Sequence, residues 1–177
     1  MLMRRLHSIF QIPVLVLIFS AAPAQEPTGP QPKRPRVPED YQAGTLKELA
    51  AKAASRESLG NKGETMLVDP DLSPTRVRAK YAQLTGRTPE NKSEVIRQWS
   101  RLYAGSLETY KPYEVDVAFL EDGSDYWLTF TKKTLKSFWD SGAWNKPVDL
   151  FVIKMGAVKR ENKWVPVVLV ESFQPAK

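Results

Sequence analysis

The sequence lacks cysteine and has a single histidine, His7, among its 177 residues. Without cysteine the chain forms no disulfide and offers no thiolate nucleophile or thiolate metal ligand. His7 lies in a segment that we expect to be removed. The remaining chain then excludes a Ser-His-Asp triad, a zinc site with nitrogen or sulfur ligands, and a haem held by His or Cys. We therefore predict no metal and no cofactor, and we assign no catalytic residue.

Residues 1–24 have the pattern of a secretory signal peptide. A positive start precedes an apolar run over residues 9–22, and Ala22-Pro23-Ala24 places small residues at the −3 and −1 positions of a cleavage site. The apolar run is shorter than the ~20 residues of a transmembrane helix. We therefore expect an exported protein, periplasmic or secreted, that begins at Gln25 and has no membrane span after cleavage.

Residues 25–42 contain five prolines among polar and basic side chains. Such a stretch buries little apolar surface and favours an extended conformation. It predicts a proline-rich linker. The remaining residues, 43–177, are enough for one domain, and their strand-rich part covers about residues 64–173.

Three helices are predicted within this domain. The first covers residues 45–59, where Thr45 and Glu48 match a capping box. The second covers residues 88–103, with Thr88 as its N-cap, and the third is a short helix over residues 133–140. The second helix carries an apolar stripe that must be buried against the domain. This stripe consists of Val95, Ile96, Trp99, Leu102 and Tyr103.

The segment 75–81 alternates between apolar and basic residues, which is typical of a strand with one solvated face. Val77, Ala79 and Tyr81 face the core in this interpretation. The opposite face carries a basic stripe. The stripe consists of Arg76, Arg78 and Lys80.

Asp122-Gly123 between two apolar runs predicts a β-hairpin with a type I′ turn. A two-residue turn determines the pairing of both strands, and it leaves Trp127 on the face opposite the core. The core-side pairs are Phe119 with Tyr126, Val117 with Leu128, and Val115 with Phe130. The other pairs are Glu121 with Ser124, Ala118 with Trp127, Asp116 with Thr129, and Glu114 with Thr131.

The last two strands, residues 148–158 and 164–173, are apolar at nearly every position. They should be covered on both faces or curl into a barrel. The order of five strands, with a helix between the third and the fourth, resembles the OB-fold over residues 64–173. We therefore expect an α+β domain, a small five-stranded antiparallel OB-like barrel or curled sheet with two to three packed helices. The alternative is an α+β roll with helices on one face of a curved sheet.

The same C-terminal stretches, Val148-Asp-Leu-Phe-Val-Ile-Lys-Met-Gly156 and Trp164-Val-Pro-Val-Val-Leu-Val-Glu-Ser-Phe173, are similar to uncharacterised exported bacterial proteins. The resemblance carries no known activity. It implies no residue role in this chain.

Two sets of residues are candidate binding sites. Arg76, Arg78 and Lys80 would form an anion-binding face, or simply a solvated one that discourages strand pairing. Trp127 on the outer face and Trp144 in a loop would stack on sugars or pack against a protein.

We predict a non-enzymatic binding or structural module of the cell envelope or extracellular space. Its expected partner is an envelope protein or an anionic polymer, and export argues against nucleic acid. Two alternatives stay open. One is a hydrolase of envelope glycans that uses carboxylates such as Glu114 and Asp116. The other is a membrane-tethered scaffold whose N-terminal segment is not cleaved.

Overall fold

The computed structural model describes residues 36–55, 65–69, 73–104 and 113–176. The predicted signal peptide and residues 25–35 of the predicted linker lie outside these ranges. The chain divides into a segment, Met1–Pro35, and a compact unit, Arg36–Lys177. Among the described helices, none has the length and apolar character needed to cross a membrane.

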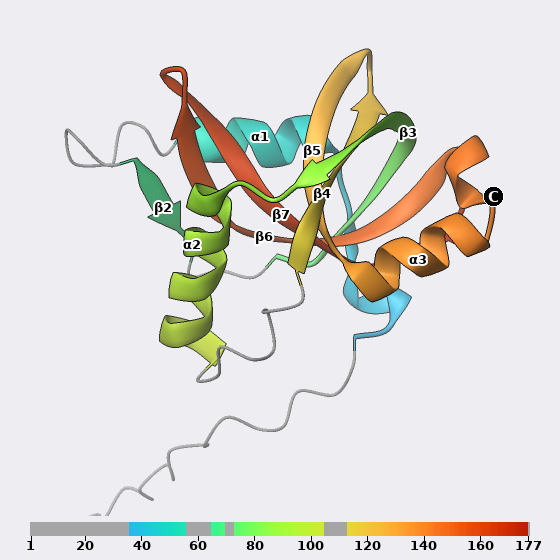
Figure 1. Ribbon diagram of the computed structural model, residues 1–177, viewed down its shortest axis with the longest axis horizontal. Coiled ribbons are helices and arrows are strands. Elements are labelled where there is room, and N and C mark those ends of the chain that lie inside the picture. Colours follow the sequence, from blue (N-terminus) through green and yellow to red (C-terminus); the bar gives the residue numbers. More distant parts are fainter. Residues whose placement is uncertain (1–35, 56–64, 70–72, 105–112, 177) are drawn as a thin grey trace, which may run out of the picture. The chain divides into compact units, whose positions relative to one another are not determined.

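The described part of the compact unit is α+β, with one mixed sheet of seven strands and three α-helices (Figure 1). The strand order is β1-β3-β4-β5-β7-β6-β2, and β3 also pairs with β6. The strands are β1 (Gln42–Ala43), β2 (Met66–Val68), β3 (Thr75–Arg87), β4 (Tyr113–Glu121), β5 (Ser124–Thr131), β6 (Val148–Arg160) and β7 (Lys163–Pro175). The helices are α1 (Leu46–Ser55), α2 (Glu90–Trp99) and α3 (Lys132–Asp140), with short helical turns η1 (Pro38–Asp40), η3 (Ser100–Ala104) and η4 (Ala143–Asn145).

The expected α+β class is confirmed, but the expected set of five antiparallel strands is wrong in two respects. Two short strands, β1 and β2, extend the sheet at its edges, and they are too short to give an alternating sequence pattern. Two pairings are parallel, β1 with β3 and β5 with β7. The parallel pairing of β5 with β7 follows from the α3 crossover and the antiparallel β6 that separate them along the chain.

Residues 36–42, which we expected in the linker, pack against the domain. Arg36 donates to both carboxylate oxygens of Glu171, at 2.7 and 2.8 Å. The Tyr41 hydroxyl donates to the same carboxylate at 2.5 Å, and its ring meets Phe151 edge-on with centroids 5.0 Å apart. Burial and the neighbouring Glu171 raise the pKa of Tyr41. The compact unit therefore begins at Arg36 and includes these residues of the expected linker.

The β4–β5 hairpin has the predicted register. The core-side pairs and the pairs of Ala118 with Trp127 and Asp116 with Thr129 all occur. Asp122 and Gly123 both have positive φ, 50° and 76°, as a type I′ turn requires. The last predicted pair is wrong, because a register shift next to Glu114 pairs Tyr113 with Thr131 instead.

The capping box of α1 is confirmed. The Glu48 backbone N–H donates to the Thr45 hydroxyl, and the Thr45 N–H donates to the Glu48 carboxylate, both at 3.0 Å. Glu121, at the end of β4, accepts from the next two helix N–H groups, those of Leu46 and Lys47, at 2.9 Å each. The hairpin thus supplies a negative charge to the positive end of the α1 dipole. The predicted end of this helix, at residues 59–60, lies outside the described residues.

The predicted N-cap of α2 is wrong. Pro89 occupies the cap position and makes no side-chain cap bond. The Thr88 hydroxyl instead donates to Asp116 on β4, at 3.1 Å. The Thr88 side chain therefore joins the start of α2 to a buried carboxylate on β4, and it does not cap the helix.

The apolar stripe of α2 is confirmed in part. Val95, Ile96 and Trp99 are buried, but Leu102 is 65% exposed. After Trp99 the chain continues as a π-helical turn, η3. The wider turn rotates Leu102 away from the buried stripe. The Tyr103 side chain lies outside the described residues.

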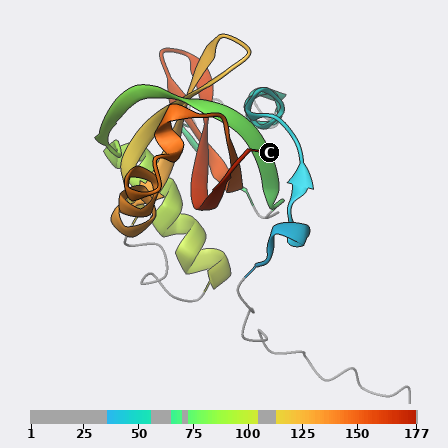
Figure 2. The ribbon, with the colours of Figure 1, turned by 90° about the vertical axis from the view of Figure 1, so that its right-hand side faces the viewer.

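Both faces of the sheet carry helices (Figure 2). Two large hydrophobic clusters lie on the two faces. The inner cluster contains residues of α1, α3 and the inward-facing side of the strands. In the outer cluster, α2 covers the opposite face of β6 and β7. The alternative of a roll with helices on one face is therefore wrong. The last two strands are covered on both faces, as predicted. The outer cluster contains Val95, Ile96, Trp99, Ile153, Met155, Val158, Val167 and Leu169.

Strand β2 approaches β6 closely at Gly156, which pairs with Val68. A Cβ atom at position 156 would lie 2.0 Å from the backbone oxygen of Leu67. Only glycine therefore permits this pairing.

Candidate functional site

A buried ion pair links α2 to the hairpin. Lys92 Nζ lies 2.6 Å from Asp116 Oδ2 and donates to the Trp127 backbone oxygen at 3.1 Å. The other Asp116 oxygen accepts from the hydroxyls of Thr88 and Thr129, at 3.1 and 2.7 Å. The two charged side chains are only 5% and 4% exposed. All their strong polar atoms have partners, so this cluster stabilises the position of α2 and offers nothing to a ligand.

The carboxylate pair considered for a hydrolase does not form a site. Asp116 is buried in the cluster just described, whereas Glu114 is exposed and pairs with Lys132 at 2.7 Å. The hydrogen bond from Lys132 lowers the pKa of Glu114. A general acid in a glycosidase needs a raised pKa and access to the substrate, and neither residue has both.

The second buried ion pair joins Lys154 on β6 to Asp69, at 2.7 Å. The Trp99 indole N–H donates to the Asp69 backbone oxygen at 2.9 Å. This contact holds α2 against the segment that follows β2. It too lies in the packed interior rather than at an opening in the surface.

A groove with a volume of about 780 Å³ opens where four elements meet. The last residues of β3, the outward side of α2, the first residues of β4 and the start of α3 line it. Its volume lies within the range of small-molecule and cofactor sites, roughly 300–1,000 Å³. Three cations and two carboxylates line it: Arg87, Arg97, Lys132, Glu90 and Glu114.

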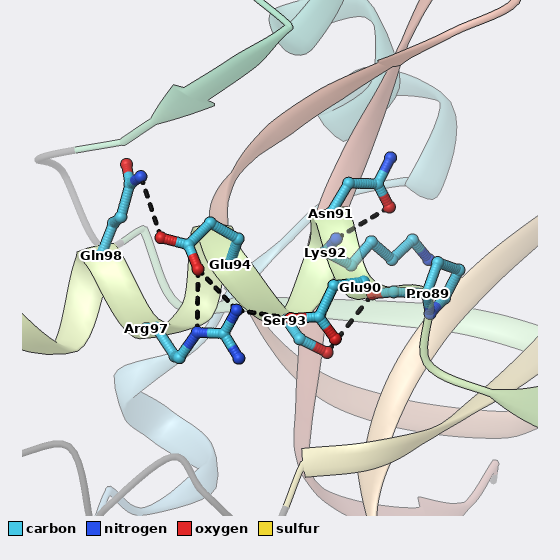
Figure 3. A network of polar contacts seen from close by, with 8 residues as sticks. All are labelled: Pro89, Glu90, Asn91, Lys92, Ser93, Glu94, Arg97 and Gln98. Atoms are coloured by element: carbon cyan, nitrogen blue, oxygen red, sulfur yellow. Dashed lines mark hydrogen bonds and ion pairs between the residues drawn. The ribbon is translucent and has the colours of Figure 1, made fainter.

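The cations of the groove differ in how strongly they are neutralised. Arg97 lies 2.5 Å from both Glu90 and Glu94 on the exposed side of α2, where Figure 3 shows it between them. The hydrogen bonds from Arg97 and Gln98 lower the pKa of Glu94. Lys132 is paired with Glu114. Arg97 and Lys132 thus already have carboxylate partners that hold them in position. An anionic ligand would have to displace these carboxylates to bind the two cations.

Arg87 differs from the other two cations of the groove, which are both in ion pairs. Within the described residues no ion pair or hydrogen bond of its side chain is found, and it is exposed at the end of β3. It lies close enough to Glu114 to lower the pKa of that carboxyl, after the larger effect of Lys132. The planar guanidinium group of Arg87 can therefore bind a carboxylate or phosphate group of a ligand in the groove.

The predicted basic stripe is exposed on β3, as the alternation indicated. Arg78 forms a two-point ion pair with Asp149 on β6, at 2.8 and 3.2 Å. This pair lowers the pKa of Asp149. Arg76 and Lys80 pair along the sheet with Phe151 and Leu120, on different neighbouring strands. The three cations of the stripe therefore face different surroundings, and none of them lines the groove.

The two predicted tryptophans come from separate elements. Trp127 lies on the outer face of β5, partly exposed, and lines a small hollow of about 180 Å³ together with Leu46 and Arg160. Trp144 lies in η4 and is 40% exposed. Its neighbour Ala143 is the residue that enters the core. No described cavity contains both tryptophans.

A scan against protein-family models, a search of curated proteins and a search of solved structures found no match for the chain. No cluster of three or more metal-ligating side chains occurs among the described residues.

The sequence did not indicate the groove, because its cations lie far apart in the chain. Arg87 ends a strand, Arg97 lies in the third turn of α2, and Lys132 begins α3. The burial of Lys92 in the ion pair with Asp116, by contrast, could have been predicted from one local signal. Lys92 lies three, four and seven residues before the buried stripe of α2, a position that places it on the buried face.

Proposed function

We propose that this protein is an exported, non-enzymatic binding module with an OB-like barrel, and that its groove binds an anionic polymer of the cell envelope. The groove carries this proposal, because its Arg87 has no ion-pair partner among the residues that the structure describes. The signal-peptide pattern of residues 1–24 supports export.

The pairing of the strands supports an OB-like barrel. Strand β3 pairs with β4, β4 with β5, β5 with β7, β7 with β6, and β6 again with β3. The helix α3 connects the third and the fourth of these five strands. Both features match the OB-fold, whose ligands are bound on the face of its second and third strands and by the connection between the first and the second.

The position of the groove supports a polymeric ligand. It lies against the connection between β3 and β4, the connection that carries α2 and corresponds to a ligand-binding loop of the OB-fold. OB-folds bind oligonucleotides and oligosaccharides there. The expected export of this protein favours an acidic oligosaccharide. The guanidinium group of Arg87 suits a carboxylate on such a chain.

The test uses fluorescence anisotropy with labelled polygalacturonate fragments, a carboxylated glycan, and with neutral dextran as the comparison ligand. We expect salt-sensitive binding of polygalacturonate only. Arg87→Gln should weaken it at least about tenfold, which corresponds to about 1.4 kcal/mol.

Arg76→Gln is the matched control. It removes an exposed arginine from the same strand, outside the groove. We expect it to change the affinity little. A larger loss in Arg76→Gln than in Arg87→Gln would move the site to the basic stripe, and equal binding of dextran would contradict an anionic ligand.

A further inference from the structure

The outer face of β3, β4 and β5 is open near the hairpin turn. Leu120 pairs with Lys80 on one side and with Asp125 on the other, so the three residues form one row across the strands. Leu120 is 37% exposed, and both charged neighbours are exposed. A leucine therefore lies between a cation and an anion on a surface that no described element covers.

The next row of the same face is apolar. Between Tyr81 and Thr85 the register shifts, so the bulged residues of β3 lie opposite Ala118, which pairs with Trp127 on its other side. Gly86 pairs with Asp116, which lies on the outer side of the sheet under α2. Leu84 is two residues before Gly86, so strand alternation places it on the same outer side. Leu84 is 48% exposed.

Lys80 and Asp125 do not neutralise each other within one molecule. They lie on the two sides of β4, roughly 10 Å apart at the usual strand spacing. No described ion pair includes either residue, although Arg160 lines the hollow next to Asp125. Within the described part of the chain, the face thus presents a cation without an ion-pair partner on one side of β4 and an anion without one on the other.

Such a surface is complementary to itself. A two-fold axis parallel to β4 and passing at Leu120 exchanges the two sides of the face between the copies. The cation of each molecule then meets the anion of the other, Leu120 meets Leu120, and Leu84 meets Trp127. We propose that a second copy of this chain docks here, in a weak symmetric dimer in which each Lys80 pairs with Asp125 of the other copy.

The size of the patch sets the strength of this dimer. Two exposed leucines and a partly exposed tryptophan form a small apolar centre, well below that of an obligate dimer. We therefore expect a reversible equilibrium rather than a permanent assembly. The inference is independent of the proposed function, because neither charged residue lines the groove.

Sedimentation velocity over a wide range of concentrations tests the proposal on the protein expressed with its own leader. The wild type should shift from monomer to dimer as the concentration rises. Lys80→Glu and Asp125→Lys should each raise the dissociation constant at least about tenfold. The double variant, with both charges exchanged, should return it close to the wild-type value. Leu120→Gln should also weaken the dimer.

Lys146→Glu is the matched control, because it reverses an exposed lysine outside this face. It should leave the dissociation constant unchanged. Circular dichroism checks that every variant is folded. A monomer at all concentrations, a dimer that survives both single reversals, or a double variant that stays monomeric would each overturn the proposal.

Discussion

The two outer surfaces of the sheet differ in what covers them. On β6 and β7, helix α2 packs its apolar stripe against Ile153, Met155 and Leu169, and the surface is closed. On β3, β4 and β5 the outer face carries charges on either side of a few apolar residues, and the groove opens beside it. One sheet thus has an outer surface on β6 and β7 that a helix covers and another on β3, β4 and β5 that stays open. Changes to the first should unfold the protein, whereas changes to the second should alter binding.

The largest expected effect comes from tryptophans on the two surfaces. Trp99→Ala removes a buried ring and its hydrogen bond to the Asp69 backbone, so it should reduce the free energy of unfolding by about 3–5 kcal/mol. Trp127→Ala and Trp144→Ala should each cost clearly less. Urea denaturation measures all three. A loss in Trp127→Ala as large as that in Trp99→Ala would show that Trp127 belongs to the core.

The buried ion pair allows the next comparison. Lys92→Met leaves the carboxylate of Asp116 buried without its cation, and it should destabilise by about 3 kcal/mol. Lys132→Met is the control, because it breaks an exposed ion pair that solvent screens. Its unfolding midpoint in urea should match that of the wild type. Equal losses in the two variants would mean that burial does not decide the strength of these pairs.

A smaller effect is expected at the hairpin turn. Gly123→Val forces a β-branched residue into a positive φ, and it should destabilise by more than about 1 kcal/mol. No atom lies within 4 Å of the added Cβ position, so the backbone conformation is the cause. Gly123→Asn separates this cause from the loss of glycine itself, because asparagine tolerates positive φ. It should retain most of the stability.

The smallest effect depends on pH. The ion pair with Arg78 lowers the pKa of Asp149 below its ordinary value of 3.8. The Asp149 carboxylate therefore binds a proton less readily in the folded protein than in the unfolded chain. The contribution of Asp149 is therefore complete above that value and is lost as the pH falls below it. Wild type should exceed Asp149→Asn in stability at neutral pH, and the difference should shrink in acid. Glu39→Gln, an exposed carboxylate change, should show no such trend.

Local signals predicted the local structure well. The two-residue turn at Asp122 determined the hairpin register because alternation leaves no other register that buries the apolar side. Thr45 and Glu48 are close in sequence, so their reciprocal capping could be predicted without the fold. The one wrong hairpin pair lies at Glu114, where a bulge interrupts the regular alternation.

Long-range features could not be predicted from the same signals. Lys92 and Asp116 are charged residues, which usually lie in solvent, and only the packing of α2 on the hairpin makes their burial favourable. Glu121 caps a helix far from it in the sequence. The groove is lined by both Arg87, at the end of β3, and Lys132, at the start of α3, and the spacing of these residues in the sequence does not indicate that they line one opening.

The pairing of β3 with β6 also determines how the protein can fold. The hairpins β4–β5 and β6–β7 join neighbouring segments and can form early. The pairing of Ala79 with Val148 joins strands that have the whole first hairpin and α3 between them. Loop-closure entropy therefore delays this step until the intervening elements are compact. Until it is complete, the apolar residues of β6 remain accessible, and this is the stage at which the chain is most exposed to aggregation.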